Sequence, residues 1–152
     1  MMNRVEQKRV YQIQPAILQH LRGLGDAPVA AGLEKSLIEL VKLRASQING
    51  CAFCLNMHAR EARELGERQE RLDLVAVWDE VACFTKREMA ALAWTEALTL
   101  VAEGHVPDPA YEAARAEFSE EELVNLTAAI VAINSWNRIA IAFRFMPPVK
   151  PA

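Results

Sequence analysis

The sequence predicts an all-α fold, and three features of the chain support that class. Apolar residues recur three or four positions apart, helix-start and helix-stop signals recur along the chain, and no run alternates apolar and polar residues as a half-buried strand does. With 152 residues, the chain has the usual size of one domain and can bury about 70% of the surface that its unfolded form exposes. We therefore expect residues 1–152 to form a single-domain helical bundle with about six to eight helices.

Proline and glycine residues set the expected ends of the first helices. Pro15 suits the first turn of a helix that Gly23 or Gly25 ends, so residues 25–28 are predicted to form a linker. Glycines in the left-handed conformation are expected to end the next two helices, which cover about residues 33–48 and 51–65.

Capping boxes mark the start of two later helices. Both Thr85-Lys-Arg-Glu88 and Ser119-Glu-Glu-Glu122 have the spacing of a capping box, in which the first and last side chains each accept a hydrogen bond from the other residue's backbone N–H group. The helix after Ser119 is apolar on nearly every side until Pro147, so we expect it to be central or to lie in an interface. The helices predicted in this half cover about residues 72–78, 86–103, 109–118 and 119–146.

Charge and hydropathy exclude several functional classes. The net charge is −3 and the basic residues are scattered, so the chain has no electrostatic footprint for nucleic acid or anionic lipid. The N-terminal residues are charged and lack the apolar core of a signal peptide, and the longest uncharged stretch, 123–137, is shorter than the roughly 20 residues of a membrane span. Three cysteines suit a reducing compartment. We expect a cytoplasmic protein that binds neither nucleic acid nor membrane.

Cys51, Cys54 and His58 are arranged for redox chemistry. Their spacing of three and four residues places all three side chains on one face of a helix. A thiolate is the reactive form of cysteine, an imidazole one turn away accepts its proton, and a second nearby thiol traps a sulfenic acid as a disulfide. The positive end of the helix alone would favour Cys51 as the nucleophile. We also expect Cys51, at the start of the helix, to be the more exposed sulfur.

Two other interpretations of this motif stay open on spacing alone. The cysteines and the histidine can be ordinary core residues, or they can bind zinc together with one carboxylate. We favour redox chemistry over zinc, because three ligands crowd one helical face and no second pair occurs elsewhere. A thioredoxin-type motif is excluded, since it belongs beside a βαβ unit that the sequence does not show.

Glu39 has two interpretations on spacing alone. It lies at the edge of an apolar stripe, where a carboxylate can be partly desolvated, but helical glutamates are mostly solvated, which favours an exposed ion pair with Lys35 or Lys42. Arg44 falls within the same stripe and so needs a partner. Cys83 has apolar neighbours and is predicted to be an inert packing residue.

Glu39, Cys51, Cys54 and His58 also follow a family pattern. The pattern is Glu, eleven residues, Cys-x-x-Cys, three residues and His, and each member is present at matching spacing. It resembles the signature of the alkylhydroperoxidase D-like, carboxymuconolactone decarboxylase superfamily. The resemblance covers about residues 15–145 and includes Arg71-Leu72, Trp78, Ala91-Leu-Ala-Trp94 and Asn134-Ser-Trp-Asn-Arg138.

The resemblance implies an all-helical alkylhydroperoxidase D-like fold, a homo-oligomer (a hexamer or a trimer) and a peroxidase. Its implied roles make Cys54 the thiol that attacks peroxide, Cys51 the thiol that resolves the product, and Glu39 and His58 the proton relay. This reverses the solvated interpretation of Glu39. The best-known peroxidase of the family has a histidine between its cysteines, where this chain has Ala52-Phe53. The lactone decarboxylase branch lacks the cysteine pair.

The predicted function is a thiol-dependent peroxidase that reduces a hydroperoxide to alcohol and water. It passes through a Cys54 sulfenic acid and a Cys51–Cys54 disulfide, needs no metal or cofactor, and draws electrons from a dithiol or from a lipoyl-bearing or thioredoxin-like donor. The alternative is a non-catalytic oligomeric or redox-sensing helical module. A sensor would oxidise once and would not turn over with excess dithiol.

Overall fold

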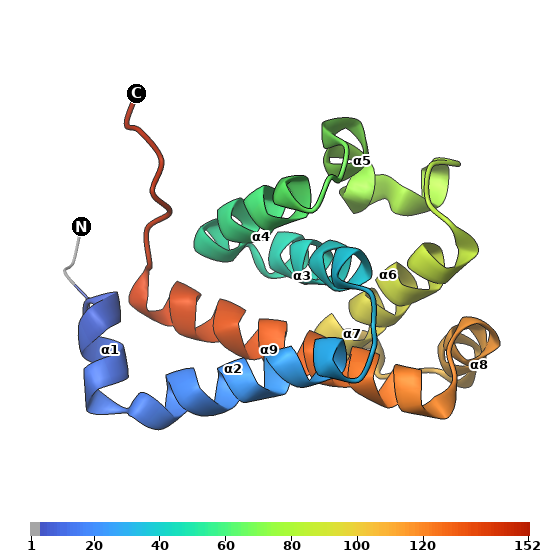
Figure 1. Cartoon of the computed structure of the whole chain (residues 1–152), viewed down its shortest axis with the longest axis horizontal. Coiled ribbons are helices and arrows are strands. Elements are labelled where there is room, and N and C mark those ends of the chain that lie inside the picture. Colours follow the sequence, from blue (N-terminus) through green and yellow to red (C-terminus); the bar gives the residue numbers. More distant parts are fainter. Residues whose placement is uncertain (1–3) are drawn as a thin grey trace.

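The computed structural model describes residues 4–152, and within that range it is all-α, as predicted (Figure 1). It has nine α-helices and one 3₁₀ helix, against the six to eight helices expected. The elements are α1 (Gln7–Ile13), α2 (Pro15–Ala30), α3 (Lys35–Asn49), α4 (Ala52–Glu64), α5 (Gln69–Leu74), η1 (Val75–Glu80), α6 (Lys86–Thr99), α7 (Val101–Gly104), α8 (Asp108–Glu117) and α9 (Glu120–Phe143).

The helix ends that depend on local sequence signals are confirmed. Gly50 ends α3 with a φ of 68°, and Gly66 follows α4 with a φ of 94°, both in the left-handed region that favours glycine. Both capping boxes are complete, with Thr85 at the start of α6 and Ser119 at the start of α9. The short turn at Gly50 places α3 and α4 next to each other, which brings their facing side chains together.

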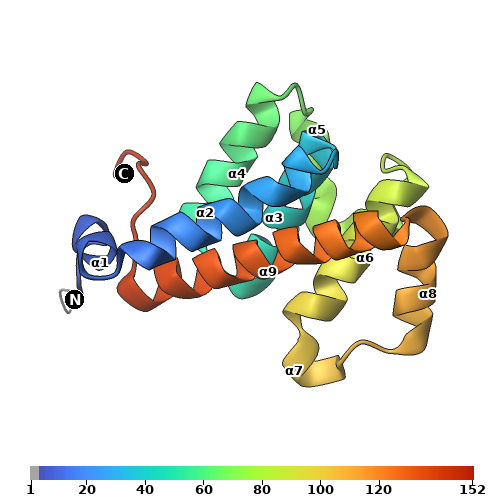
Figure 2. The ribbon, with the colours of Figure 1, turned by 60° about the horizontal axis from the view of Figure 1, so that its bottom comes forward.

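The central element is α9, which lies side by side with α2 and also contacts α3 (Figure 2). Leu126, Ala129, Ile130 and Ile133 are buried along it. Truncating a side chain such as Ile130 to alanine in this core would cost about 2–5 kcal/mol, because a cavity is added to the lost burial.

By length and composition alone, α9 could cross a membrane, and it is the one helix within residues 4–152 that meets this test. The sequence-based argument, that the uncharged stretch 123–137 is too short to cross a membrane, therefore does not hold for the whole of α9. Within the apolar window of α9, 39% is buried inside the structure. The core helix of a soluble protein has the same length and composition.

The predicted linker at residues 25–28 is wrong, because α2 continues to Ala30 with Pro28 inside it. A proline removes one helical hydrogen bond, but Pro28 lies in the last turn and is buried. A Cβ atom at Gly25 would meet Cβ of Ala132 at 3.9 Å, so α2 and α9 approach closely there. Packing against α9 therefore holds α2 helical through the glycine and the proline.

Two further differences lie at the ends of the bundle. The helix predicted over 86–103 is divided at Leu100 into α6 and α7. The helix α1, which the sequence analysis did not predict, carries one buried residue, Val10, and packs on α2. Both α1 and the C-terminal tail lie at the same end of the molecule (Figure 1).

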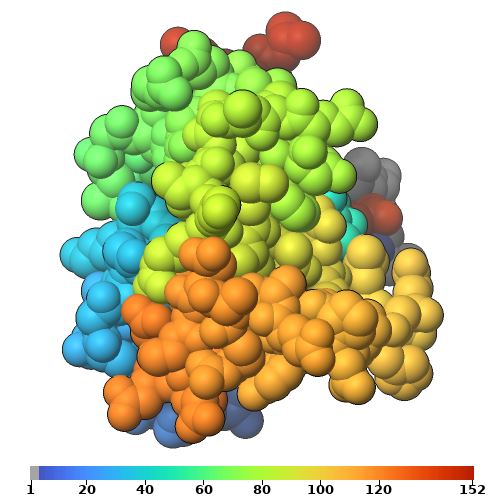
Figure 3. Space-filling view, turned by 90° about the vertical axis from the view of Figure 1, so that its right-hand side faces the viewer, coloured from blue at the N-terminus to red at the C-terminus, as the bar shows by residue number. Residues whose placement is uncertain are grey.

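Arg87 joins the elements at the opposite end, which Figure 3 shows with α8 and the start of α9 in orange. Its Nε donates to Glu34 at 2.9 Å, before α3, and its Nη2 donates to Glu122 at 2.8 Å on α9. Its Nη1 also donates to the backbone carbonyl of Glu117 at 2.8 Å. The Arg87 guanidinium on α6 thus holds the starts of α3 and α9 and the end of α8 together.

Candidate active site

The two thiols of the Cys-x-x-Cys motif lie at the start of α4. Cys51 is the N-cap residue, and its Sγ accepts the backbone N–H of Cys54 at 3.4 Å. The two Sγ atoms are 2.7 Å apart and both cysteines are free thiols. Cys51 and Cys54 are 1% and 2% exposed. The expectation that Cys51 is the more exposed sulfur is therefore wrong, because both cysteines are packed in one apolar cluster with Val10, Ile133 and Phe145.

The dithiol shares one negative charge unequally. The pKa of Cys51 is lowered to about 7, chiefly by its hydrogen bond with Cys54, and burial only partly opposes this. The pKa of Cys54 is raised, first by the same hydrogen bond with Cys51 and then because burial and the charge on Cys51 disfavour a second thiolate. The pair therefore loses its first proton near neutral pH, and the resting charge lies on Cys51.

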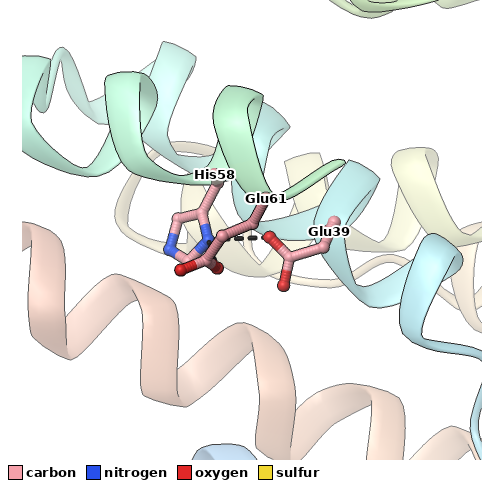
Figure 4. A group of neighbouring side chains, drawn as sticks. All are labelled: Glu39, His58 and Glu61. Carbon is pink, nitrogen blue, oxygen red and sulfur yellow. Dashed lines mark hydrogen bonds and ion pairs between the residues drawn. The ribbon is translucent and has the colours of Figure 1, made fainter. Parts of the chain in front are cut away.

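Glu39 and His58 form a buried pair between α3 and α4 (Figure 4). His58 Nδ1 lies 2.8 Å from Glu39 Oε2, and Lys42 Nζ lies 3.1 Å from Glu39 Oε1. Glu39 is 7% exposed, so the solvated ion pair that spacing favoured is wrong in exposure, although Lys42 is indeed a partner. Glu39 and His58, which the sequence analysis placed in one relay, are in direct contact.

Glu61 is a further member of this group, and the sequence analysis missed it. Its Oε2 lies 3.3 Å from the same Nδ1 atom of His58. The i,i+3 spacing from His58 on α4 was the signal that could have found it. Burial lowers the pKa of His58, but the two carboxylates outweigh it and the net pKa is raised. The hydrogen bond to His58 in turn lowers the pKa of Glu61.

These three side chains also resemble a metal-binding group. The donor atoms of Glu39, His58 and Glu61 all lie within 4.8 Å of one another, and two carboxylates with one imidazole can bind a divalent cation. The zinc set considered from the sequence differs, since it combined both cysteines with His58 and one carboxylate. In the structure, Lys42 already places a positive charge on Glu39, and an oxygen of each carboxylate lies 2.8 or 3.3 Å from the Nδ1 atom of His58.

A pocket of about 350 Å³ opens beside the motif, where α1, α2, α4 and α9 meet. Cys54 and His58 line it and Cys51 does not. The aromatic part of its wall includes the Tyr11 ring, which makes an edge contact with that of Trp136 at 6.2 Å between ring centroids. The negative charge of the resting dithiol thus lies on Cys51, whereas the sulfur that the pocket reaches is that of Cys54.

Polar side chains of α3 and α9 lie behind the sulfurs. Asn137 and Ser46 are fully buried, and Asn137 Nδ2 donates to Ser46 Oγ at 3.1 Å. Asn49 Nδ2 donates to Asn137 Oδ1 at 2.9 Å. Asn137 belongs to the segment of family resemblance, but its contact with the motif depends on how α9 packs against α3, which spacing does not predict.

Arg44 and Cys83, which the sequence places outside the motif, both have neighbours in the structure. Arg44 has the partner that it needs, because its Nε donates to Glu96 Oε1 at 2.8 Å, and Trp78 Nε1 donates to the same oxygen at 2.9 Å. Cys83 is half-buried and packs with the cluster around Leu72.

Comparisons with known proteins agree with this architecture. A family model described as the carboxymuconolactone decarboxylase family matches residues 15–97. The uncharacterized protein YdfG of Bacillus subtilis (strain 168) is 38% identical over 132 residues, which cover 87% of this chain and 90% of that protein.

Solved structures show the same fold. A protein of unknown function from Agrobacterium tumefaciens, described as a candidate antioxidant-defence protein AhpD, is 43% identical with a TM-score of 0.90, over 98% of this chain and 100% of that one. A peroxidase-related protein with an AhpD core from Ralstonia eutropha JMP134 is 22% identical with a TM-score of 0.78, over 91% of this chain and 74% of that one, and supports the fold alone. The chain belongs to the carboxymuconolactone decarboxylase family.

Proposed function

We propose that the protein is a thiol-dependent peroxidase that reduces hydroperoxides at Cys54. The observation that carries the proposal is one arrangement: two free thiols 2.7 Å apart, with Cys54 facing a pocket of about 350 Å³ that His58 also lines. The family includes enzymes, and a structure 43% identical to this chain is described as a candidate antioxidant-defence protein. The similarity supports the reaction class and the pocket supports the residue assignment.

The first step moves the charge to the accessible sulfur. A proton shift along the short contact from Cys54 to Cys51 turns the resting pair into a Cys54 thiolate beside a Cys51 thiol. The Cys54 thiolate attacks the terminal oxygen of ROOH, so that an S–O bond forms and the O–O bond breaks. Because the Nδ1 side of protonated His58 is bonded to carboxylates, Nε2 is left to give its proton to the departing RO⁻. The products are the Cys54 sulfenic acid, ROH and neutral His58.

The second step closes the disulfide. Cys51 attacks the sulfenic sulfur, an S–S bond forms, and the hydroxyl group leaves with the Cys51 proton as water. The disulfide is a two-electron oxidised form, so an external dithiol must return the enzyme to two thiols by exchange. We assign this role to a dithiol, which a lipoyl-bearing or thioredoxin-like donor would present. The reaction needs no metal or other cofactor.

The assembly and location are also proposals. Exposed apolar residues on α9 support a homo-oligomer, either a hexamer or a trimer, since Val124 is 69% exposed and Val131 48%. Light scattering that gave a stable monomer at micromolar concentration would exclude it. A reductant-dependent cycle and three free thiols suit the cytoplasm, and we assign no nucleic-acid or membrane partner.

Turnover tests the proposal. The reduced protein is mixed with excess hydroperoxide and excess dithiol, and the peroxide consumed per protein chain is counted. A peroxidase consumes many equivalents, and the Cys54→Ser variant consumes none above the dithiol background. A protein that oxidises once and then stops is a redox sensor, the alternative function.

A further inference from the structure

The amide network that links Asn134, Asn49 and Asn137 has a fixed direction. It starts at the backbone carbonyl of Ile130, which can only accept a hydrogen bond. Asn134 Nδ2 donates to that carbonyl at 3.0 Å and to Thr99 Oγ1 at 3.1 Å, so its Oδ1 must be the accepting end. Arg138 Nη1, which can only donate, approaches the same Oδ1 at 3.0 Å.

Asn49 links Asn134 to Asn137 and so fixes the orientation of the Asn137 amide. Its Nδ2 donates to Asn134 Oδ1 at 3.0 Å and to Asn137 Oδ1 at 2.9 Å, which uses both of its amide hydrogens. The Asn137 oxygen therefore faces Asn49, and a turned amide would set two donors against each other. The Asn137 Nδ2 group must point the other way, toward Ser46 and the start of α4.

The Asn137 Nδ2 group gives one hydrogen to Ser46 at 3.1 Å, which leaves it a second hydrogen. On α9, Ile133 and Ala140 lie about one turn to either side of Asn137 and pack in one cluster with Cys51 and Cys54, so Asn137 faces the dithiol. The Asn137 amide acts on both thiols in the direction of a lower pKa, against the burial that raises the pKa of each. Asn137 is fully buried, and within residues 4–152 no buried side-chain nitrogen or oxygen lacks a partner. An uncharged donor in such a place favours a thiolate without adding a second charge to the core.

We propose that Asn137 is the positioning residue for the dithiol, and that its amide, aimed by Asn49, holds the negative charge of the Cys51–Cys54 pair at the base of the pocket. The role deepens the proposed peroxidase and rests on it only for the use of the thiolate. Other groups act on the same pair, since the charge of His58 lowers the pKa of Cys51, and Tyr11 on α1 interacts with Cys54. Asn137 differs from them in serving both sulfurs.

The test measures the first pKa of the dithiol by thiolate absorbance against pH, in a Cys83→Ser background and without peroxide. Asn137→Asp keeps the side-chain shape but replaces the donor with an acceptor, and should raise that pKa by about one unit or more, the scale of one hydrogen bond to a charged group. Alkylation by iodoacetamide at neutral pH should slow about tenfold. Asn137→Ala should raise the pKa in the same direction without burying a carboxylate.

The matched control is Thr99→Val, which removes the bond from Asn134 Nδ2 at the far end of the network but keeps the bond to Ile130. It should lower stability without moving the thiolate pKa. Circular dichroism identifies variants that fold. If neither Asn137 variant folds, the half-buried Asn49→Ala serves, because a freed Asn137 amide can turn its oxygen to the sulfurs and raise the pKa.

An unchanged thiolate pKa in the folded variants overturns the role of Asn137, and a shift equal to that of Thr99→Val reduces it to a structural one. Peroxide turnover is measured separately on the unsubstituted protein. A normal pKa shift with no turnover would leave Asn137 in place and reject the peroxidase. Peroxide turnover together with an unchanged thiolate pKa would support the peroxidase and reject the role of Asn137.

Discussion

His58 Nδ1 lies 2.8 Å from Glu39 Oε2, although the two residues are 19 positions apart and on different helices. Both are buried, at 4% and 7% exposure. The contact uses one ring nitrogen of His58 and so leaves Nε2 for proton transfer in the pocket, in the arrangement by which a carboxylate orients a catalytic histidine.

Glu39→Gln is expected to slow peroxide consumption by about 10²-fold, the scale of losing a general acid or base, because an amide does not raise the pKa of His58 as the carboxylate does. The measurement is the steady-state rate with excess dithiol, and circular dichroism should show an unchanged fold. Glu64→Gln, which changes an exposed carboxylate at the end of α4 that pairs with Arg60, is the matched control and should keep the full rate. An unaltered rate in Glu39→Gln would remove Glu39 from the relay.

The rate should have a bell-shaped dependence on pH. It rises as the dithiol loses its first proton, with the pKa of Cys51 at about 7, because the thiolate attacks. It falls at higher pH as His58 loses the proton that it donates, and the raised pKa of His58 moves this fall upward from the ordinary value. Glu61→Gln removes one cause of that raised pKa and should shift the falling limb to lower pH. A limb that stays in place would show that Glu61 does not act on His58.

The purified protein should contain less than one equivalent of zinc, because Lys42 already pairs with Glu39 and because the raised pKa of His58 makes a proton compete with a metal ion for its ring. Elemental analysis after purification without chelator makes the measurement. A full equivalent that Glu61→Gln removes would favour a metal at Glu39, His58 and Glu61, whereas a full equivalent that only Cys54→Ser removes would favour the cysteine set.

The sequence predicts those parts of the fold that depend on local chemistry. Gly50 and Gly66 end helices because only glycine adopts their positive φ without strain, and the two capping boxes satisfy N–H groups within four residues. Pro28 inside α2 could not be predicted, since the packing of α2 on α9 outweighs the local preference of the proline.

The candidate site divides in the same way. The spacing of Cys51, Cys54 and His58 within one helix predicted their common face. The burial of Glu39 depends on how α4 packs against α3. The position of Asn137 depends on how α9 packs, since Asn137 is 91 residues away from its partner Ser46 in the sequence. Contacts of that range have no local signature, so family resemblance was needed for Glu39, and the role of Asn137 needed the structure.

Ser119→Ala tests the fold independently of the chemistry. The Ser119 Oγ accepts the Glu122 backbone N–H at 3.1 Å, and removing such an N-cap should lower the free energy of unfolding by about 1 kcal/mol. Ser135→Ala on the exposed face of α9 is the control and should have a smaller effect, because its hydroxyl only bonds a carbonyl already within the helix. Urea unfolding of both variants provides the comparison, and equal stability would show that the cap contributes nothing.

The identity of the attacking sulfur is the most direct test of the account, since the resting charge lies on Cys51 while the pocket opens at Cys54. The measurement is trapping of the sulfenic acid, followed by mass spectrometry, in Cys51→Ser and Cys54→Ser treated with one equivalent of hydroperoxide. We predict that Cys51→Ser consumes one equivalent and stops with the sulfenic acid on Cys54, and that Cys54→Ser consumes none. A sulfenic acid formed on Cys51 in Cys54→Ser at the rate of the unsubstituted protein would contradict the account.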